Sequence, residues 1–212
     1  PARWVFLDEV DAYPGDVDEE GDPITLAEAR TTSFGHRSKL FLASTPTIKG
    51  LSRIEKEFEA SDQNRYHVPC PHCGGLQWLK FERLKWDKGS PESVAYICEH
   101  CDEPIQERHK TAMMDEANGA CWLQTAPDDV RQKAEAAGIV GFHISALYSP
   151  LGWLSWADIA RKWEDAAGDD SKLKTLKNTL LGETWQEKGE APDWQRLYER
   201  REPRKMGFVP EG

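Results

Sequence analysis

The run Arg-Trp-Val-Phe-Leu-Asp-Glu at residues 3–9 is the stretch that decides the fold. Its apolar part is typical of a buried strand, and it ends abruptly in two acids, Asp8 and Glu9. A second apolar run, Leu40–Ala43, leads directly into Ser44 and Thr45. If the two runs are parallel neighbours, their carboxyl ends lie on one rim of a sheet, which is where open α/β folds bind ligands. The pattern therefore predicts an α/β fold with polar groups gathered at that rim.

Nucleoside triphosphatases use this combination of residues. An aspartate at a strand end holds Mg²⁺, usually through water, and the next glutamate orients and deprotonates the attacking water. We therefore interpret Asp8 as a Mg²⁺ ligand and Glu9 as the catalytic base, while the hydroxyls of Ser44 and Thr45 can sense the γ-phosphate or its loss. The alternative is that the two acids only solvate the end of a strand. The 212 residues contain no GxxxxGK[ST] phosphate-binding loop.

Four of the five cysteines form two CxxC pairs, Cys70/Cys73 and Cys98/Cys101. A CxxC turn brings two thiolates to one point, and two such turns supply the four soft ligands of a tetrahedral zinc ion. The first turn is followed by Gly74, whereas Asp102 follows the second. A disulfide or redox pair is the alternative, but no secretory signal accompanies it. We expect Cys121 to be a buried apolar residue beside Trp122, and the histidines nearby to surround the metal or to face solvent: His67, His72, His100 and His109.

Composition and charge set further bounds. The chain has 39% hydrophobic and 30% charged residues, which is enough apolar material for a packed core and excludes disorder as the main description. No apolar stretch is long enough for a membrane span and no secretory leader is present, so we expect a cytosolic protein without a membrane partner. Of the net charge of −10, eight acidic side chains lie in residues 8–22, while residues 196–205 carry an excess of basic groups. Charge alone neither requires nor forbids a DNA partner.

The remaining patterns predict further elements. Helical turns are expected at 26–32, helices at 52–60, 107–117, 155–167 and 171–185, and strands at 66–68, 76–86, 93–97 and 139–148. Ser52 followed by Glu55 predicts a capping box at the start of the helix at 52–60. The stripe Trp156, Ile159, Ala160 and Trp163 has helical spacing and is interpreted as core rather than as a ligand surface.

Taken together, these motifs resemble the large subunit of tailed-phage terminases, in particular the lambda-like GpA family. Residues 5–9 resemble its Walker B motif and residues 42–47 its coupling motif. Three further tracts match, namely Val68-Pro-Cys-Pro-His-Cys-Gly74, Leu147-Tyr-Ser-Pro150 and Asn178-Thr-Leu-Leu-Gly-Glu-Thr-Trp185. The single motifs are short, but their order and spacing are specific and span nearly the whole chain.

The resemblance implies a fold, an activity and partners. The fold would be part of a P-loop (ASCE-type) ATPase sheet with a zinc-ribbon insertion and C-terminal helices. The activity would be ATP hydrolysis that drives double-stranded DNA into procapsids, with cleavage by a metal-dependent nuclease domain expected after Gly212. ATP, Mg²⁺ and structural Zn²⁺ would be the cofactors. The small terminase subunit, the portal or procapsid and further copies in an oligomeric motor would be partners in the host bacterial cytoplasm.

We divide the chain accordingly. Residues 1–65 would be the C-terminal half of the ATPase core, 66–126 the zinc-ribbon insertion, 127–188 the remaining ATPase strand and helices, and 189–212 a linker. A central strand rarely stands alone at a chain end, so we expect a fragment whose preceding strands and phosphate-binding loop lie before Pro1, and which alone hydrolyses little ATP. Arg30 is a candidate arginine finger, in cis or toward a neighbouring subunit, although an exposed helix arginine is the simpler explanation.

Two other functions remain open. Asp8-Glu-Val-Asp11 is also a DExD string and Ser44-Thr45 is placed like a Ser-Ala-Thr motif, so a superfamily 2 helicase is one alternative, although no later arginine-rich nucleotide motif follows. The other is a non-enzymatic zinc-ribbon module that binds DNA or protein. DNA contacts are expected to be weak and non-specific, through basic residues near Trp78 and Trp86 or after the coupling motif: Lys80, Arg83, Lys85, Lys88, Lys49 and Arg53. The alternative is that these side chains only face solvent.

Overall fold

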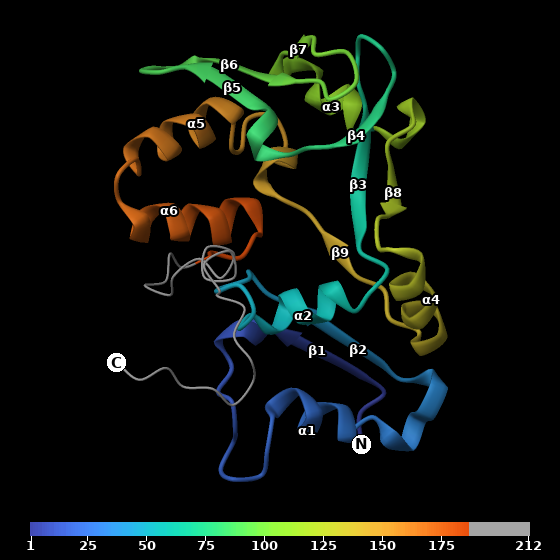
Figure 1. Ribbon diagram of the computed structural model, residues 1–212. Coiled ribbons are helices and arrows are strands. Elements are labelled where there is room, and N and C mark those ends of the chain that lie inside the picture. The colour runs from blue at the N-terminus through green and yellow to red at the C-terminus, as the bar shows by residue number, and fades with distance from the viewer. Residues whose placement is uncertain (187–212) are drawn as a thin grey trace, which may run out of the picture.

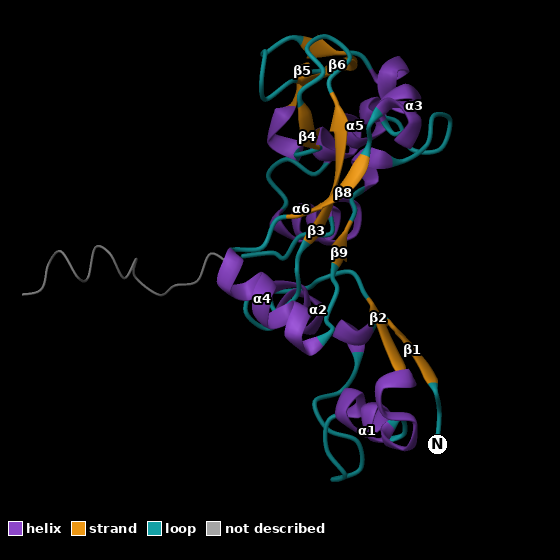
Figure 2. Cartoon of the chain, turned by 90° about the vertical axis from the view of Figure 1, so that its right-hand side faces the viewer, coloured by secondary structure: helices purple, strands orange, loops and turns teal. Residues whose placement is uncertain are grey.

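The computed structural model describes residues 1–186 and shows a mixed α/β chain drawn out along one axis (Figures 1 and 2). Its helices are α1 (Pro23–Ala29), α2 (Arg53–Glu59), α3 (Lys110–Met113), α4 (Asp128–Ala137), α5 (Trp156–Asp165) and α6 (Asp170–Leu176). Its strands are β1 (Trp4–Asp8), β2 (Lys39–Ala43), β3 (Asn64–Pro69), β4 (Leu76–Trp78), β5 (Leu84–Asp87), β6 (Ser90–Ile97), β7 (Pro104–Ile105), β8 (Cys121–Gln124) and β9 (Phe142–His143). The linker at 189–212 and the basic segment at 196–205 lie outside the described residues.

Strands β1 and β2 form the parallel pair that the sequence predicts. Their register places Phe6 beside Phe41 and Asp8 beside Ala43. The expectation that the first strand is buried is wrong for this chain, because Trp4 is 59% exposed, Phe6 73% and Phe41 57%. Side chains alternate between the two faces of a strand, so Val5 and Leu7 are half-buried on one face while the other stays open in a two-stranded sheet.

Strand β3 is the axis of the molecule. It pairs antiparallel with β8 along one edge, and along the other it pairs antiparallel with β4 and parallel with β9. A separate sheet has the order β5-β6-β7 and stands at the far end from β1 (Figure 1). The single strand expected at 76–86 is therefore wrong: β4 belongs to the first sheet, β5 to the second, and a 3-10 turn at Phe81–Arg83 redirects the chain between them.

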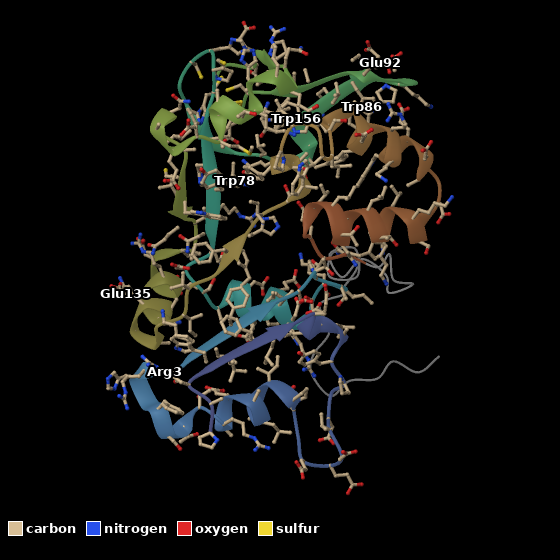
Figure 3. All side chains as sticks on the ribbon, turned by 180° about the vertical axis from the view of Figure 1, so that it is seen from behind. Arg3, Trp78, Trp86, Glu92, Glu135 and Trp156 are labelled. Atoms are coloured by element: carbon tan, nitrogen blue, oxygen red, sulfur yellow. The ribbon has the colours of Figure 1, made fainter. Side chains whose placement is uncertain are left out.

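The core lies among the cysteine-bearing segments and helix α5. Trp156, Ile159 and Ala160 are fully buried, which confirms the interpretation of that stripe as core. Figure 3 shows Trp156 in this region, between α5 and the β5–β6 ribbon, and its ring centroid lies 6.0 Å from that of Tyr96. Residues 66–126 thus share one hydrophobic core with α5, so the two segments pack as one body.

Several predicted elements are shorter than expected. Helix α2 begins after Ser52, whose hydroxyl accepts the Glu55 N–H, but only half of the capping box is present because the Glu55 carboxylate accepts from Gly50 instead. The helix at 107–117 is only α3 flanked by 3-10 turns, and the strand at 139–148 is reduced to β9 and a 3-10 turn at Ala146–Tyr148. The helix at 171–185 ends in a π-helix at Lys177–Leu181. Across residues 1–186, every helix falls short of the length and apolar content needed to cross a bilayer.

Candidate nucleotide rim and metal centre

The carboxyl ends of β1 and β2 meet on one rim. Asp8 is the last residue of β1 and lies beside Ala43, so Ser44 is the next residue on the neighbouring strand. Asp8 and Glu9 are exposed. Glu9 has a left-handed backbone (φ 54°), and its N–H donates to Asp8 Oδ1 over 3.0 Å. Such a conformation is uncommon for a non-glycine residue and is concentrated at functional sites.

Asp11 is the residue at this rim that the motif assignment passed over. Its Oδ2 accepts both the N–H and the hydroxyl of Thr47, at 2.9 and 2.8 Å, and its Oδ1 accepts the N–H of Ile54 at 2.8 Å. Its own N–H donates to Ser44 Oγ over 3.2 Å. The signal in the sequence was the fourth position of the DExD string, which pointed only to the helicase alternative.

The hydroxyls at the end of β2 differ in their surroundings. Ser44 Oγ accepts from Asp11 and donates to the carbonyl of Thr45 over 3.0 Å, so its hydroxyl holds the loop in place. Thr45 is exposed at the rim. The structure therefore brings Asp8, Glu9 and Ser44 together, with Thr45 next in the chain.

The candidate arginine finger is not at this rim. Arg30 follows α1, and its carbonyl accepts the N–H of Ala2, just before β1 begins. A strand rises about 3.3 Å per residue, so the Arg30 backbone lies roughly 20 Å from Asp8. The Arg53 guanidinium forms an ion pair with Asp22 at 2.9 Å and donates to the Pro14 carbonyl over 2.7 Å. Its charge therefore stabilises the acidic loop, residues 8–22.

The four paired cysteines converge on one point. Their sulfur atoms all lie within 4.8 Å of one another, and Cys70–Cys101 and Cys73–Cys98 are each separated by 3.9 Å. Four sulfurs around a tetrahedral zinc at about 2.3 Å would be about 3.8 Å apart, whereas a disulfide needs about 2.05 Å. The donor set therefore fits a tetrahedral metal and does not fit two disulfides.

The two cysteine turns have the same backbone. In the first turn, the Cys70 N–H donates to the Gly75 carbonyl, and the Gly74 N–H donates to the Cys70 carbonyl. In the second turn, the Cys98 N–H donates to the Glu103 carbonyl, and the Asp102 N–H donates to the Cys98 carbonyl. Gly74 has φ 74° and Asp102 has φ 56°, so the aspartate adopts the left-handed conformation that glycine provides in the first turn. The missing glycine therefore does not alter the second turn.

Neighbouring groups donate hydrogen bonds to the cysteine sulfurs. His100 N–H and Gln77 Nε2 donate to Cys98 Sγ at 3.4 and 3.5 Å. Burial opposes ionisation of Cys98, but the N–H groups of His100 and Cys101 lower the pKa of its thiol to about 7. The ring nitrogen His100 Nε2 lies 2.9 Å from the Leu76 carbonyl and His72 Nε2 lies 3.3 Å from that of Pro104, so both rings pair with backbone oxygen around the cysteine cluster. Cys121 is half-buried on β8 beside Trp122, and less enclosed than expected.

Four basic residues near Trp78 and Trp86 are candidates for DNA contact, and two of them are paired with acids. Lys80 Nζ lies 2.6 Å from Glu99 and 3.8 Å from the centroid of the Trp78 ring, and Arg83 lies 3.1 Å from Asp102. Lys85 and Lys88 are exposed on and beside β5.

Comparison with known proteins decides the family. A family model described as "Phage terminase large subunit gpA, ATPase domain" matches residues 1–122, more than half of the chain. The chain belongs to the phage terminase large subunit gpA family. The resemblance seen in the motifs is thereby confirmed. A second model, "Terminase large subunit gpA, endonuclease domain", matches residues 139–212, so the expectation that the nuclease region lies only after Gly212 is wrong.

Two curated relatives give the same result. The chain is 35% identical to the terminase large subunit of Escherichia phage lambda and 37% identical to that of Enterobacteria phage P21, each over 92% of this chain and 32% of the relative. It thus spans about a third of their length. No solved structure matches the chain. The proposed division of the gpA chain at 65, 126 and 188 stays a prediction.

The two matched regions of this gpA chain meet at residues 47–49, which follow β2. Ile48 forms a parallel bridge with Trp185, Trp185 N–H donates to Thr47 and Lys49 N–H donates to Trp185, each over 2.9 Å. Thr184 Oγ1 donates to Glu55 Oε1 over 2.6 Å. Residues 184–185 therefore extend the rim beside the segment that follows β2.

A half-buried polar cluster lies next to this junction. An Arg65 guanidinium N–H donates to His143 Nδ1 over 3.0 Å, so His143 Nε2 carries the proton and donates to the Gly182 carbonyl over 3.0 Å. Burial and the Arg65 charge both lower the pKa of His143, and burial raises the pKa of Glu183. The histidine is therefore neutral at neutral pH.

Proposed function

We propose that this chain is part of a viral DNA-packaging motor in which ATP hydrolysis drives double-stranded DNA into a procapsid in the host bacterial cytoplasm. Membership of the gpA family supports this, and the longer relatives suggest that the activity belongs to a larger polypeptide. The observation that carries the proposal is the shared rim, where Asp8 and Glu9 at the end of β1 lie beside Ser44 at the end of β2. The small subunit, the portal and further motor copies are its proposed partners.

The roles at the rim follow from the residue types. Asp8, an exposed carboxylate at a strand end, would hold Mg²⁺, which when bound neutralises charge on phosphate oxygens. Glu9 would orient the attacking water and accept its proton. Ser44 and Thr45 would report the state of the γ-phosphate to the segment that follows. These roles presuppose a P-loop (ASCE-type) sheet, to which another part of the longer polypeptide would contribute the phosphate-binding loop.

The four cysteines are proposed to bind one structural Zn²⁺ in a zinc ribbon. Four thiolates fill a tetrahedral site and leave no open position for substrate. Cys70 and Cys98 are buried in the main core, so the metal would hold together the segments on which α5 packs. The role proposed for this ion is therefore stability rather than catalysis.

Glu9→Gln tests the catalytic assignment in the longest natural polypeptide that contains these residues. The substitution keeps size and shape but removes the base, so ATP hydrolysis should be lost while ATP still binds. Glu20→Gln, which removes the same charge from the exposed part of the acidic loop, should hydrolyse ATP at the wild-type rate. Steady hydrolysis by the Glu9→Gln protein would contradict the proposed function.

A further inference from the structure

We infer that Asp11 is a positioning residue for ATP hydrolysis, which ties the catalytic end of β1 to the coupling segment and to helix α2. This inference rests on the proposed function of the rim. Asp11 lies two residues after Glu9, in the 3-10 turn Val10–Ala12 that leads away from β1. Its partners lie 33 to 43 residues further along the chain. One side chain and its own N–H thus join three separate segments.

Both carboxylate oxygens are used in this junction. Oδ2 holds the N–H and hydroxyl of Thr47, and Oδ1 holds the N–H of Ile54 in the first turn of α2. Hydrogen bonds to an ionised acceptor are about twice as strong as neutral ones. Partial burial raises the pKa of Asp11, but the Ile54 N–H, the Ser52 side chain and the two Thr47 donors outweigh it and lower the pKa below its ordinary value. The side chain is therefore ionised at neutral pH and acts by holding backbone, not by contacting substrate.

The contacts of Asp11 also affect the position of Glu9, the proposed catalytic base. Glu9 N–H is bonded to Asp8, and the Glu9 carbonyl accepts from Ala12, so the turn containing Asp11 also fixes the backbone of Glu9. On the other side, Asp11 N–H holds Ser44 Oγ. Without the Asp11 carboxylate, the links to Thr47 and Ile54 would be lost, and only the Asp11 N–H to Ser44 and the β1–β2 pairing would still position the Glu9 turn against the segment after β2. A displacement of about 1 Å at a catalytic group can cost about 100-fold in rate.

Asp11→Asn is the sharpest test because an amide has nearly the same shape. Asparagine keeps one acceptor oxygen, but its NH₂ group would face a backbone N–H of Thr47 or Ile54, so one of the two connections must break. Asp18→Asn is the matched control, since Asp18 is exposed in the same acidic loop and asparagine tolerates its left-handed φ of 51°. Glu9→Gln in parallel tests the proposed function itself.

The measurement is steady-state ATP hydrolysis by the longest natural polypeptide that contains these residues, with folding checked by circular dichroism at the assay temperature. We expect kcat for Asp11→Asn to fall by about 10- to 100-fold while KM for ATP stays within about twofold. Asp18→Asn should match the wild type. A wild-type kcat for Asp11→Asn, or a fall that only follows the unfolded fraction, overturns the inference.

Two further outcomes keep the interpretations apart. If Glu9→Gln is inactive and Asp11→Asn is fully active, the inference fails and the proposed function stands; if Glu9→Gln still hydrolyses ATP, both fail. Should Asp11→Asn not fold, Thr47→Val decides by the same criteria, because it removes only the hydroxyl that donates to Oδ2. The expected fall in kcat for Thr47→Val is smaller, about threefold to tenfold, since the N–H of residue 47 still donates to Asp11.

Discussion

Replacing Tyr148 with phenylalanine should loosen the core where the cysteine-bearing segments meet the rest of the chain. The Tyr148 hydroxyl accepts the N–H of Leu79 at 2.7 Å and donates to the carbonyl of Tyr66 at 2.6 Å. It therefore joins β3, the segment after β4 and the turn at 146–148 through a side chain that is 8% exposed. Phenylalanine would fill the space but leave both backbone groups without this partner.

The magnitude follows from those two groups. A buried N–H that loses its acceptor costs about 1–3 kcal/mol, and a carbonyl, which has a second lone pair, costs less. We therefore expect the free energy of unfolding to fall by about 2–3 kcal/mol. Because each 1.4 kcal/mol is a factor of ten, exchange of the Leu79 amide proton should become roughly 30- to 140-fold faster.

Hydrogen exchange read out by mass spectrometry on peptides covering residues 76–84 measures this directly. Tyr66→Phe is the control: its hydroxyl donates only to the Met114 carbonyl, over 2.8 Å, so it should cost about 1 kcal/mol and leave Leu79 protected. Wild-type exchange at Leu79 together with a loss below about 0.5 kcal/mol for Tyr148→Phe would refute the reasoning.

Three further predictions concern the metal, pH and DNA. Purified protein should contain one zinc per chain, and Cys70→Ser should lower both the zinc content and the stability. Cys121 lies outside the cluster, so Cys121→Ser should change neither. If metal analysis finds full zinc in Cys70→Ser, the site is excluded. Burial and Arg65 lower the folded-state pKa of His143, so its stabilising contribution should be complete above the unfolded pKa of about 6.5 and be lost as pH falls toward the folded value. Urea midpoints between pH 8 and pH 5 should show this decline, and His143→Gln should reduce it; an unchanged pH dependence would contradict the assignment. Lys85→Gln combined with Lys88→Gln should weaken the binding of labelled duplex DNA and reduce the slope of log K against log salt by about 0.9 per lost phosphate contact. Lys80→Gln, the control, should change both the affinity and the slope less. Tight, sequence-specific binding at high salt would instead favour the zinc-module alternative.

The features that sequence reasoning predicted are those with a local signature. The two apolar runs ending in Asp8 and Ser44 predicted a parallel pair and its rim, and the CxxC spacing predicted the sulfur cluster, because a turn of four residues is enough to place two thiolates. The second cysteine turn was also within reach of prediction. Aspartate is among the few residues that readily adopt φ above zero, so Asp102 is a reasonable substitute for glycine there.

The features that it missed depend on partners far away in sequence. Asp11 owes its role to Thr47 and Ile54, and Tyr148 owes its role to Leu79 and Tyr66. No pattern near either residue indicates those contacts. Arg30 shows that order along the chain does not fix position. It lies between two motif strands, but the helix before it runs back toward the start of β1 and leaves Arg30 at the other end of that strand. A role toward a neighbouring subunit stays a prediction.

The rim and residues 184–185 are far apart in sequence but lie side by side in the structure. The chain between them leaves the rim region at residues 62–64 and returns to the same place at Gly141. Asn64, at the start of β3, donates from its backbone N–H and its side chain to the Gly141 carbonyl, and Gly141 N–H donates to the buried carboxylate of Asp62. A Cβ on Gly141 would lie 2.0 Å from Ser61 Oγ, so this closure requires glycine. Since the ends of the excursion from 64 to 141 are fixed to each other, the cysteine-bearing body can be carried on the chain without separating β2 from residues 184–185. The closure at Gly141 therefore returns the chain to the start of β3, and residues 142–185 lead from there back to the Ile48–Trp185 bridge.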